Sequence, residues 1–153
     1  MSITNILLVD DEISFIETVA KRLNKRDFNV SIASGGQEAL DFLASHMTID
    51  VVILDVKMPG LDGIAVLQEI KKHYPLIQVI MLTGHATVES AIEGMKKGAF
   101  DYLMKPCAID TLIAKVNEAF NAKKHHEEKI HNARIKEIGQ SIESSRDIIN
   151  SLT

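Results

Sequence analysis

Five short apolar runs alternate with longer segments of helical periodicity over the first 120 residues, and this alternation restricts the fold most strongly. Between the runs, and after the last, apolar residues recur at spacings of three and four, as in amphipathic helices. Five strands alternating with five helices predict βαβ units, hence a parallel sheet with helices on both faces. The runs cover residues 6–9, 28–33, 51–54, 79–82 and 100–104.

The runs at 6–9 and 51–54 contain no polar residue, so these two strands are expected to be buried on both faces. Glycine and proline mark the loops between elements, and Gly98 after two lysines is a plausible helix end. The predicted fold class is therefore α/β, with a doubly wound five-stranded parallel sheet.

Length and composition restrict the class of protein further. The chain has 153 residues, a net charge of −4 and one cysteine, Cys107. One domain is the natural expectation, and an internal disulfide is excluded. The acidic balance argues against direct nucleic-acid binding, and no run approaches the length of about 20 apolar residues needed for a membrane span. With no signal peptide recognised, we expect a soluble, cytoplasmic protein.

Residues 122–153 differ from the domain predicted for residues 1–121, because they contain no β-run and no proline. Here we expect a helical tail, frayed or kinked near Gly139. Its apolar residues follow a 3-4 spacing interrupted by Ser145, which is a weak coiled-coil pattern. The tail is either a dimerising or partner-docking helix, or a solvated extension or linker. The apolar positions are Ile135, Ile138, Ile142, Ile149 and Leu152.

Polar residues follow four of the five predicted strands. Because the carboxyl ends of parallel strands meet at one sheet edge, where ligands bind in doubly wound folds, we expect these residues to gather there. Grouped carboxylates crowd like charges and are costly unless a cation or a reaction uses them. The residues are Asp10, Asp11 and Glu12 after the first strand, Asp55 and Lys57 after the third, Thr83, Gly84 and His85 after the fourth, and Lys105 and Pro106 after the fifth.

The chemistry of this set points to phosphoryl transfer. Carboxylates without cysteine or histidine beside them form a hard oxygen site, which suits Mg²⁺ better than Zn²⁺. An aspartate next to that ion can attack phosphorus. Lys105 and the Thr83 hydroxyl could then stabilise charge on the phosphoryl oxygens.

Each residue also has a simpler interpretation. Asp10 and Asp11 could cap the following helix. Thr83 and Lys105 could be an ordinary strand-end residue and an ordinary surface lysine, and Tyr102 could be a half-buried strand residue. It is their combination in one chain that favours a functional site.

Four segments together resemble the receiver domains of bacterial two-component response regulators, over residues 3 to about 121. They are Leu8-Val9-Asp10-Asp11-Glu12, the stretch from Leu54 to Gly63, Leu82-Thr83-Gly84, and the stretch from Gly98 to Pro106. The stretch from Gly84 to Pro106 is most similar to receivers of the nitrogen-regulation type. The resemblance implies a flavodoxin-like (βα)5 receiver fold and a phosphorylation-controlled signalling switch, rather than an enzyme with its own substrate turnover.

The resemblance also implies roles for individual residues. Asp55 would accept a phosphoryl group from the phosphohistidine of a sensor histidine kinase or phosphotransfer protein. Mg²⁺ would be held by Asp55, by Asp11 directly, by Asp10 mainly through water, and by the backbone carbonyl of Lys57.

Thr83 and Lys105 would grip the phosphoryl group in this family, and Tyr102 would be the aromatic residue that turns inward with Thr83. Lys57 and His85 occupy positions that tune hydrolysis of the phosphorylated state. The peptide bond between Lys105 and Pro106 is usually cis in such domains. A downstream protein would bind the surface changed by phosphorylation, or the chain would form a homodimer.

Two other functions compete with the switch. One is a scaffold or dimerisation protein that acts mainly through the helix in residues 122–153. The other is a phosphatase with an aspartyl nucleophile, of the haloacid-dehalogenase type, although that family has a second aspartate where this chain has Lys57. A flavin-binding protein is disfavoured, because its first loop must cradle phosphate and the loop here is acidic.

Overall fold

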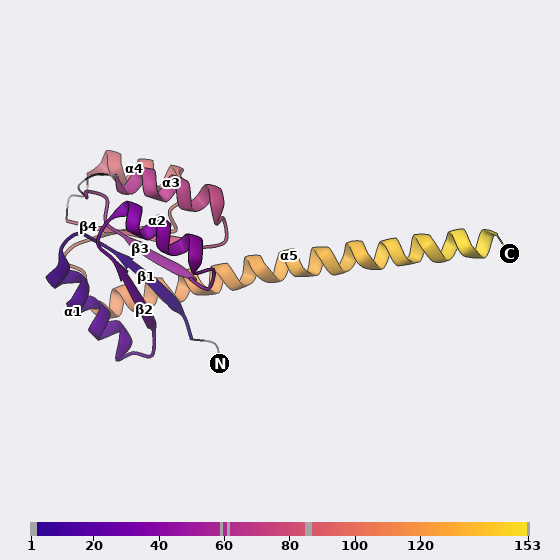
Figure 1. Ribbon diagram of the computed structural model, residues 1–153, viewed down its shortest axis with the longest axis horizontal. Helices are drawn as coiled ribbons and strands as arrows, with labels where there is room; N and C mark the ends of the chain where they lie inside the picture. The colour runs from indigo at the N-terminus through magenta and orange to yellow at the C-terminus, as the bar shows by residue number, and fades with distance from the viewer. Residues whose placement is uncertain (1–2, 59, 61, 85–86, 153) are drawn as a thin grey trace. The chain divides into compact units, whose positions relative to one another are not determined.

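The computed structural model describes residues 3–152 apart from 59, 61, 85 and 86. Strands and helices alternate throughout this part of the chain (Figure 1). The strands are β1 (Asn5–Val9), β2 (Asn29–Ala33), β3 (Val51–Leu54), β4 (Gln78–Thr83) and β5 (Asp101–Met104). The helices are α1 (Ile13–Asn24), α2 (Gly36–Ser45), α3 (Gly63–His73), α4 (Val88–Lys96) and α5 (Ile109–Ser151).

The five strands form one parallel sheet in the order β2-β1-β3-β4-β5. The chain adds β2 on one side of β1 and then β3, β4 and β5 on the other side, as in doubly wound folds. The fold class predicted from the sequence is therefore confirmed. In the register, Val9 is opposite both Ala33 and Leu54, and Thr83 is opposite Met104. The carboxyl ends of all five strands therefore lie along one edge.

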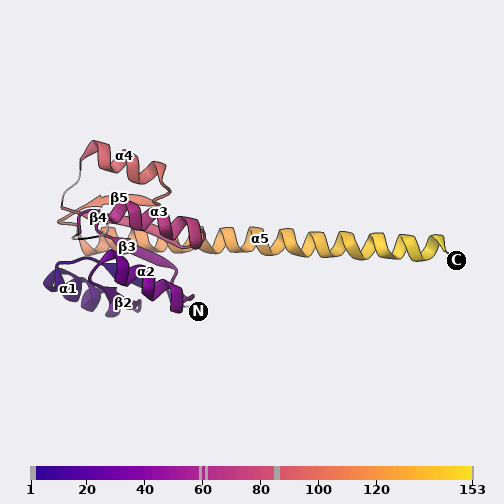
Figure 2. The same cartoon turned by 45° about the horizontal axis from the view of Figure 1, so that its top comes forward.

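Helices cover both faces of the sheet (Figure 2). Side chains of β1 alternate between the two faces: Leu7 and Val9 belong to the core under α2 and α3, whereas Ile6 and Leu8 belong to the core under α1 and the first turns of α5. Such period-two alternation is the geometry of a pleated strand with apolar layers on both sides. The prediction that the first and third strands are buried on both faces is confirmed, because both lie almost wholly inside.

Helix α4 differs from the others in the face it presents. Val88, Ile92 and Met95 give it an apolar stripe, yet these residues are between 46% and 77% exposed. Gly94 is its buried residue. The apolar periodicity of this segment thus predicts the helix correctly but marks a surface, not a core face.

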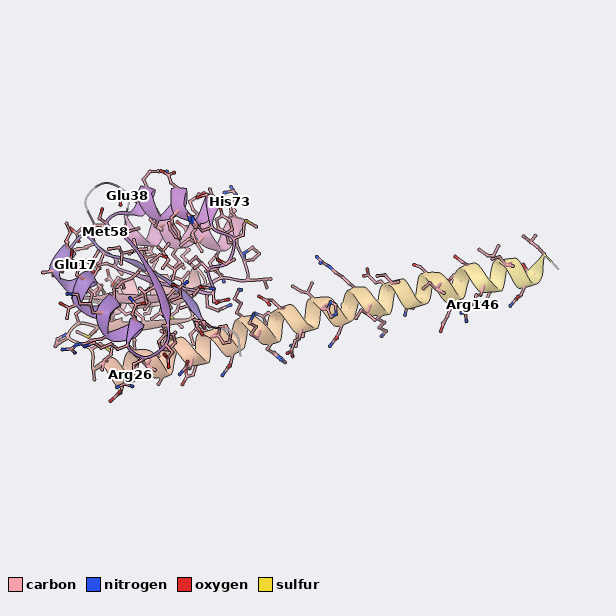
Figure 3. All side chains as sticks on the ribbon, turned by 60° about the horizontal axis from the view of Figure 1, so that its bottom comes forward. Glu17, Arg26, Glu38, Met58, His73 and Arg146 are labelled. Carbon is pink, nitrogen blue, oxygen red and sulfur yellow. The ribbon has the colours of Figure 1, made fainter. Side chains whose placement is uncertain are left out.

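A buried ion pair holds α5 against the amino end of β3. Lys123 Nζ lies 2.8 Å from Asp50 Oδ1, and both side chains are largely buried. The second carboxylate oxygen of Asp50 accepts the backbone N–H of Asn5 at 2.8 Å. Asp50 therefore has a charged partner and a hydrogen bond, as a buried carboxylate requires. Just beyond the carboxyl end of α1, Arg26 (Figure 3) pairs with Asp110 at 3.1 Å, and this second contact to α5 is exposed.

The chain divides into two units, residues 1–123 and 124–153. In the second unit the helix continues through Gly139 without interruption, so the fraying expected there is not observed. The side chains from 128 to 152 are all exposed, including the isoleucines of the heptad pattern. No helix in the described part of the chain combines the length and the apolar character that crossing a membrane would require.

Candidate functional site

Three carboxylates meet at the carboxyl edge of the sheet. Asp10 follows β1 and Asp55 follows β3, and these residues are only 1% and 3% exposed, whereas Asp11 is exposed. One carboxylate oxygen from each lies within 4.8 Å of one from each of the others. The edge predicted to collect acidic residues therefore does so.

Backbone hydrogen bonds fix the two buried aspartates. The N–H of Asp10 donates to Ala33 O at 3.2 Å, and the N–H of Asp55 donates to Val9 O at 3.0 Å. Each bond extends the strand ladder by one residue beyond the strand. The carboxylates are thus held by the sheet itself and not by a mobile loop.

Gly63 allows α3 to begin directly against the backbone of Asp55. A Cβ atom at this position would lie 2.2 Å from the carbonyl oxygen of Asp55, closer than any side chain could sit. The N–H of Gly63 donates to Val56 O at 2.9 Å, and Asp62 caps the helix by accepting the N–H of Ile64. The glycine in this loop therefore has a steric role in placing Asp55.

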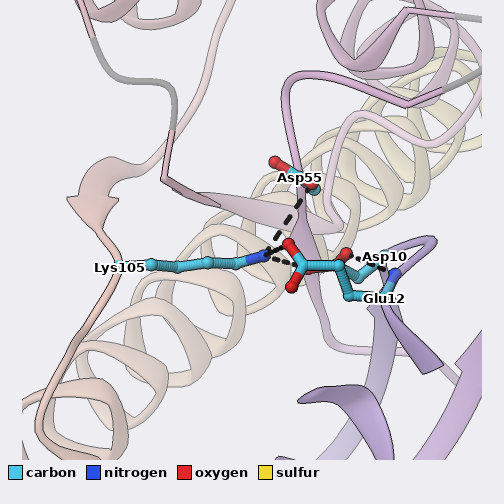
Figure 4. A network of polar contacts seen from close by, with 4 residues as sticks. All are labelled: Asp10, Glu12, Asp55 and Lys105. Atoms are coloured by element: carbon cyan, nitrogen blue, oxygen red, sulfur yellow. Dashed lines mark hydrogen bonds and ion pairs between the residues drawn. The ribbon is translucent and has the colours of Figure 1, made fainter. Parts of the chain in front are cut away.

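Lys105 reaches the acidic cluster from the end of β5 (Figure 4). Its Nζ lies 2.5 Å from Asp10 Oδ2, 3.2 Å from Glu12 Oε1 and 3.9 Å from Asp55 Oδ2. Its backbone N–H donates to Thr83 O at 2.9 Å, and the bond to Pro106 is cis, as the resemblance implied. The ammonium group thus partly neutralises three carboxylates, with Asp10 as its closest partner.

Burial and ion pairing shift the pKa values of Asp10 and Lys105 in opposite directions. Burial raises the pKa of Asp10, and the nearby Asp55 adds to the rise, while hydrogen bonds from Lys105 and the Glu12 N–H oppose it. For Lys105, burial lowers the pKa, but the hydrogen bond and charge of Asp10 outweigh it and leave the pKa raised. Lys105 therefore stays charged, whereas Asp10 carries an electrostatic cost.

One oxygen of Asp55 stands apart from this network. Asp55 Oδ1 is buried, and among the residues that the structure describes it has no hydrogen-bond partner. A buried carboxylate oxygen without a donor is unfavourable and needs an explanation in function or in a bound ion. A bound cation or a covalent bond at this oxygen would supply the partner that it lacks.

The donor set fits Mg²⁺. The three grouped side chains offer only carboxylate oxygens, which hard divalent cations prefer. An ion next to Asp55 would satisfy the unpaired Oδ1 and offset the repulsion between Asp10 and Asp55. The residues present therefore match a small divalent cation bound by few protein ligands.

Thr83 is the last residue of β4 and is completely buried. Tyr102 lies on the neighbouring strand, is half-buried, and its hydroxyl lies 2.9 Å from Ser90 Oγ. Ser90 also closes the capping box of α4 with Thr87, whose side chain accepts the N–H of Ser90 at 3.0 Å. Tyr102 thus connects β5 to the first turn of α4.

The alternative of Asp10 as a cap of α1 is not supported. The N-cap residue is Glu12, which makes no side-chain capping bond, and the one backbone N–H that Asp10 accepts among the described residues is that of Glu12. Lys57 is exposed in the loop after β3, and His85 lies outside the described residues.

Sequence reasoning missed two contacts of Lys105. Glu12 belonged to the predicted strand-end set but without a role, and Phe15 was not singled out from the sequence. The ring centroid of Phe15 lies 4.1 Å from Lys105 Nζ. Phe15 follows the acidic residues Asp10 and Asp11 by about one helical turn, and this spacing is the sequence signal that could have identified it.

Comparison with known proteins supports one family. Residues 6–117 match the response regulator receiver domain. An NtrX-like response regulator of Rickettsia felis is 39% identical over 132 residues, covering 85% of this chain and 28% of the relative. The transcriptional regulatory protein ZraR of Escherichia coli is 41% identical over 115 residues, covering 75% of this chain and 26% of the relative. The chain therefore spans little more than a quarter of these relatives.

Solved structures show the same fold. A response regulator receiver domain protein from Clostridium thermocellum has a TM-score of 0.77 at 41% identity, covering 80% of this chain and 98% of that one. The receiver domain of NtrX from Brucella abortus has a TM-score of 0.71 at 35% identity, covering 76% and 98%. Profile, sequence and structure agree that this chain belongs to the response regulator receiver domain family.

Proposed function

We propose that Asp55 is the phosphoryl acceptor of a signalling switch, as expected for a receiver domain. The observation that carries this proposal is the buried Oδ1 of Asp55, which has no hydrogen-bond partner in the described part of the chain although an ammonium group lies beside the other oxygen. This arrangement leaves one oxygen ready to form a bond, and Lys105 near enough to offset the charge that arrives.

The reaction is a displacement at phosphorus. An oxygen of Asp55 forms the new O–P bond while the P–N bond to the donor histidine breaks, and the leaving imidazole keeps the electron pair and takes a proton. The product is an acyl phosphate on Asp55. Its phosphoryl oxygens carry most of the charge, and Lys105 and the hydroxyl of Thr83 would bind them.

We assign the metal role to the acidic cluster. Asp11 and Asp55 would hold Mg²⁺ directly, Asp10 would act mainly through water, and the carbonyl of Lys57 would complete the protein ligands. When bound, Mg²⁺ neutralises charge on the carboxylates and on the phosphoryl oxygens. The side chain of Lys57, together with His85, would tune hydrolysis of the acyl phosphate.

The switch would connect Asp55 to α4. Thr83 at the end of β4 would move toward the phosphoryl group, and Tyr102 on the neighbouring strand has its hydroxyl hydrogen-bonded to Ser90 in the first turn of α4. Phosphorylation adds about −1.5 to −2 charges at the site. We propose that this biases the position of α4 and Tyr102.

The exposed stripe of α4 supplies a surface on which such a movement could be sensed. Val88, Ile92 and Met95 are apolar and exposed, and Met104 on β5 is exposed as well. Exposed apolar patches of this kind mark protein interaction sites. We propose that a downstream protein binds here, and that a sensor histidine kinase or phosphotransfer protein supplies the phosphoryl group at the Asp55 edge.

We propose that the tail pairs with a second copy of this chain. Its exposed isoleucines at 135, 138, 142 and 149 follow heptad spacing, and a helix with an unburied apolar stripe is stabilised by packing. Residues 124–153 carry five basic and five acidic side chains, so two copies would not repel each other.

Light scattering tests the paired tail. Ile142→Asp, within the stripe, should convert a dimer to a monomer, whereas Ile130→Asp, off the heptad positions, should not. A monomeric unmodified chain would contradict dimerisation. The same measurement on the unchanged chain and on Asp55→Asn, each with and without a phosphodonor, separates a switch from a scaffold. In a switch the phosphodonor changes the oligomeric state of the unchanged chain but not of Asp55→Asn, whereas in a scaffold it changes neither.

The acceptor role is tested by intact mass after incubation with Mg²⁺ and acetyl phosphate. The chain should gain one phosphoryl group, and Asp55→Asn should not. Asp62→Asn, an exposed aspartate nearby in the same loop, is the matched control and should be modified like the unchanged chain. A gain that survives Asp55→Asn would overturn the assignment. Turnover of a phosphate ester would instead favour the phosphatase.

A further inference from the structure

The aromatic face of Phe15 lies against the ammonium group of Lys105. The Nζ atom is 4.1 Å from the ring centroid, well within the range of a cation–π interaction. The Lys105 side chain is 12% exposed, so this contact is largely shielded from water. Such shielding strengthens the attraction between a cation and a ring.

Phe15 is held in place from its other side. It lies in the first turn of α1, is half-buried, and packs against the core between the sheet and helices α1 and α5. A ring anchored in this way keeps its position when neighbouring polar groups rearrange. The ring of Phe15 is therefore a fixed surface against which the side chain of Lys105 packs.

We propose that Phe15 is a positioning residue for Lys105 in phosphoryl binding. The proposal rests on the proposed function, in which Lys105 binds the phosphoryl group on Asp55. In the structure, the ammonium group lies closer to Asp10 and Glu12 than to Asp55, so it must exchange partners when the phosphoryl group arrives. Phe15 keeps it beside Asp55 during that exchange.

An aromatic face suits this task because its attraction is not directed along one bond. Hydrogen bonds to Asp10 and Glu12 specify single positions, and the side chain of Glu12 is 61% exposed, so it can draw the ammonium group toward solvent. The ring attracts the cation without competing for its three N–H donors. Lys105 can therefore move toward Asp55 while it keeps the contact with Phe15.

Loss of the Phe15 ring should weaken phosphoryl binding, because the Lys105 side chain would no longer be held near Asp55 before the phosphoryl group arrives. In Phe15→Leu, the unphosphorylated protein gains lysine conformers that point away from Asp55, and these must be given up when the phosphoryl group binds. We expect the affinity for beryllofluoride, and the rate of labelling by acetyl phosphate, to fall about three- to tenfold. Phe15→Tyr keeps the aromatic face and should retain both values.

The experiment compares the unchanged chain with Phe15→Leu, Phe15→Tyr and Phe28→Leu. Phe28 is a matched control, because it is also half-buried and packs against the same core, but it makes no cation–π contact in the described part of the chain. Proton NMR of the Lys105 εCH₂ group reports the contact directly, since a ring face shifts these resonances upfield. The shift should vanish in Phe15→Leu and persist in the other variants.

A double-mutant cycle separates positioning from packing. In the Lys105→Gln background, Phe15→Leu should cause no further loss of labelling rate, because no cation remains for the ring to hold. If labelling of Lys105→Gln is too slow to measure, the comparison of Phe15→Leu with Phe15→Tyr and Phe28→Leu distinguishes positioning from packing. Equal binding by Phe15→Leu and the unchanged chain overturns the inference, as does an equal loss in Phe28→Leu.

Failure of the proposed function has a different signature. If the unchanged chain neither binds beryllofluoride nor is labelled at Asp55, the acceptor assignment fails, and the role of Phe15 fails with it. If the unchanged chain does both and Phe15→Leu behaves identically, only the role of Phe15 is refuted.

Discussion

Lys105 Nζ lies 2.5 Å from an oxygen of Asp10 and 3.9 Å from an oxygen of Asp55. In this state the ammonium group therefore pairs mainly with the neighbour of the acceptor rather than with the acceptor itself. Asp10 holds Lys105 close to Asp55 while one Asp55 oxygen stays unpaired. The phosphoryl group and Lys105 are thus expected to meet through a short movement of one side chain.

The raised pKa of Asp10 predicts a pH dependence of stability in the absence of Mg²⁺. The folded protein binds the Asp10 proton more tightly than the unfolded chain, whose pKa is near 3.8. This contribution to the free energy of unfolding is fully present below the unfolded pKa and is lost as pH rises through the folded pKa. Urea unfolding across this pH range measures the effect. The free energy of unfolding should decline less with rising pH in Asp10→Asn than in the unchanged chain. An identical slope in both proteins would contradict a raised pKa.

Mg²⁺ should stabilise the folded chain through the acidic cluster. At a concentration 100 times the dissociation constant, the free energy of unfolding should rise by about 2.7 kcal/mol. Asp11→Asn should remove most of this gain, because it removes a direct ligand. Asp41→Asn, an exposed aspartate on α2, should retain it. Thermal unfolding with and without Mg²⁺ provides the measurement, and equal gains in both variants would argue against the assigned ligand.

Gly63→Ala should destabilise the domain strongly. Its Cβ atom would meet the backbone oxygen of Asp55 at 2.2 Å, so α3 or the acceptor loop must move. We expect a loss of about 3 kcal/mol or more in the free energy of unfolding. Gly35→Ala has no atom within 4 Å of the added carbon and should change stability by less than about 1 kcal/mol. Denaturant unfolding of both variants checks this, and similar losses would refute the steric role.

The hydroxyl of Tyr102 should couple β5 to α4. Tyr102→Phe removes the 2.9 Å contact with Ser90 and should cost about 1 kcal/mol, with faster amide exchange in the first turn of α4. Tyr74→Phe is the control, since its hydroxyl makes no hydrogen bond in the part of the chain that the structure describes. Hydrogen exchange by mass spectrometry measures both. Unchanged exchange in α4 after Tyr102→Phe would remove this link from the switch.

The sequence was sufficient to predict the sheet and the edge at which the acidic residues meet. Strand polarity and helical spacing determine which faces are buried, and parallel strands bring Asp10 and Asp55 to the same edge. These are consequences of local pattern and topology. The cis bond at Pro106 was predicted only from the family resemblance.

Other features depend on distances that no pattern encodes. The contact of Phe15 with Lys105 joins elements some 90 residues apart, and the resting pair of Lys105 with Asp10 depends on side-chain reach. Helix α4 carries an apolar stripe like the other helices, but only the three-dimensional structure shows that its Ile92 faces outward. The pair of Lys123 with Asp50 likewise joins residues that no periodicity connects.

The central claim is that Asp55, and neither of the other carboxylates in the cluster, carries the phosphoryl group. The most direct test is borohydride reduction of the chain after labelling with acetyl phosphate and Mg²⁺, followed by peptide mass spectrometry. Reduction of an acyl phosphate converts the modified aspartate to homoserine. The account predicts homoserine at position 55 and unmodified aspartate at positions 10 and 11. Homoserine at position 10 or 11, or at none of the three in a chain that has gained phosphate, would contradict it.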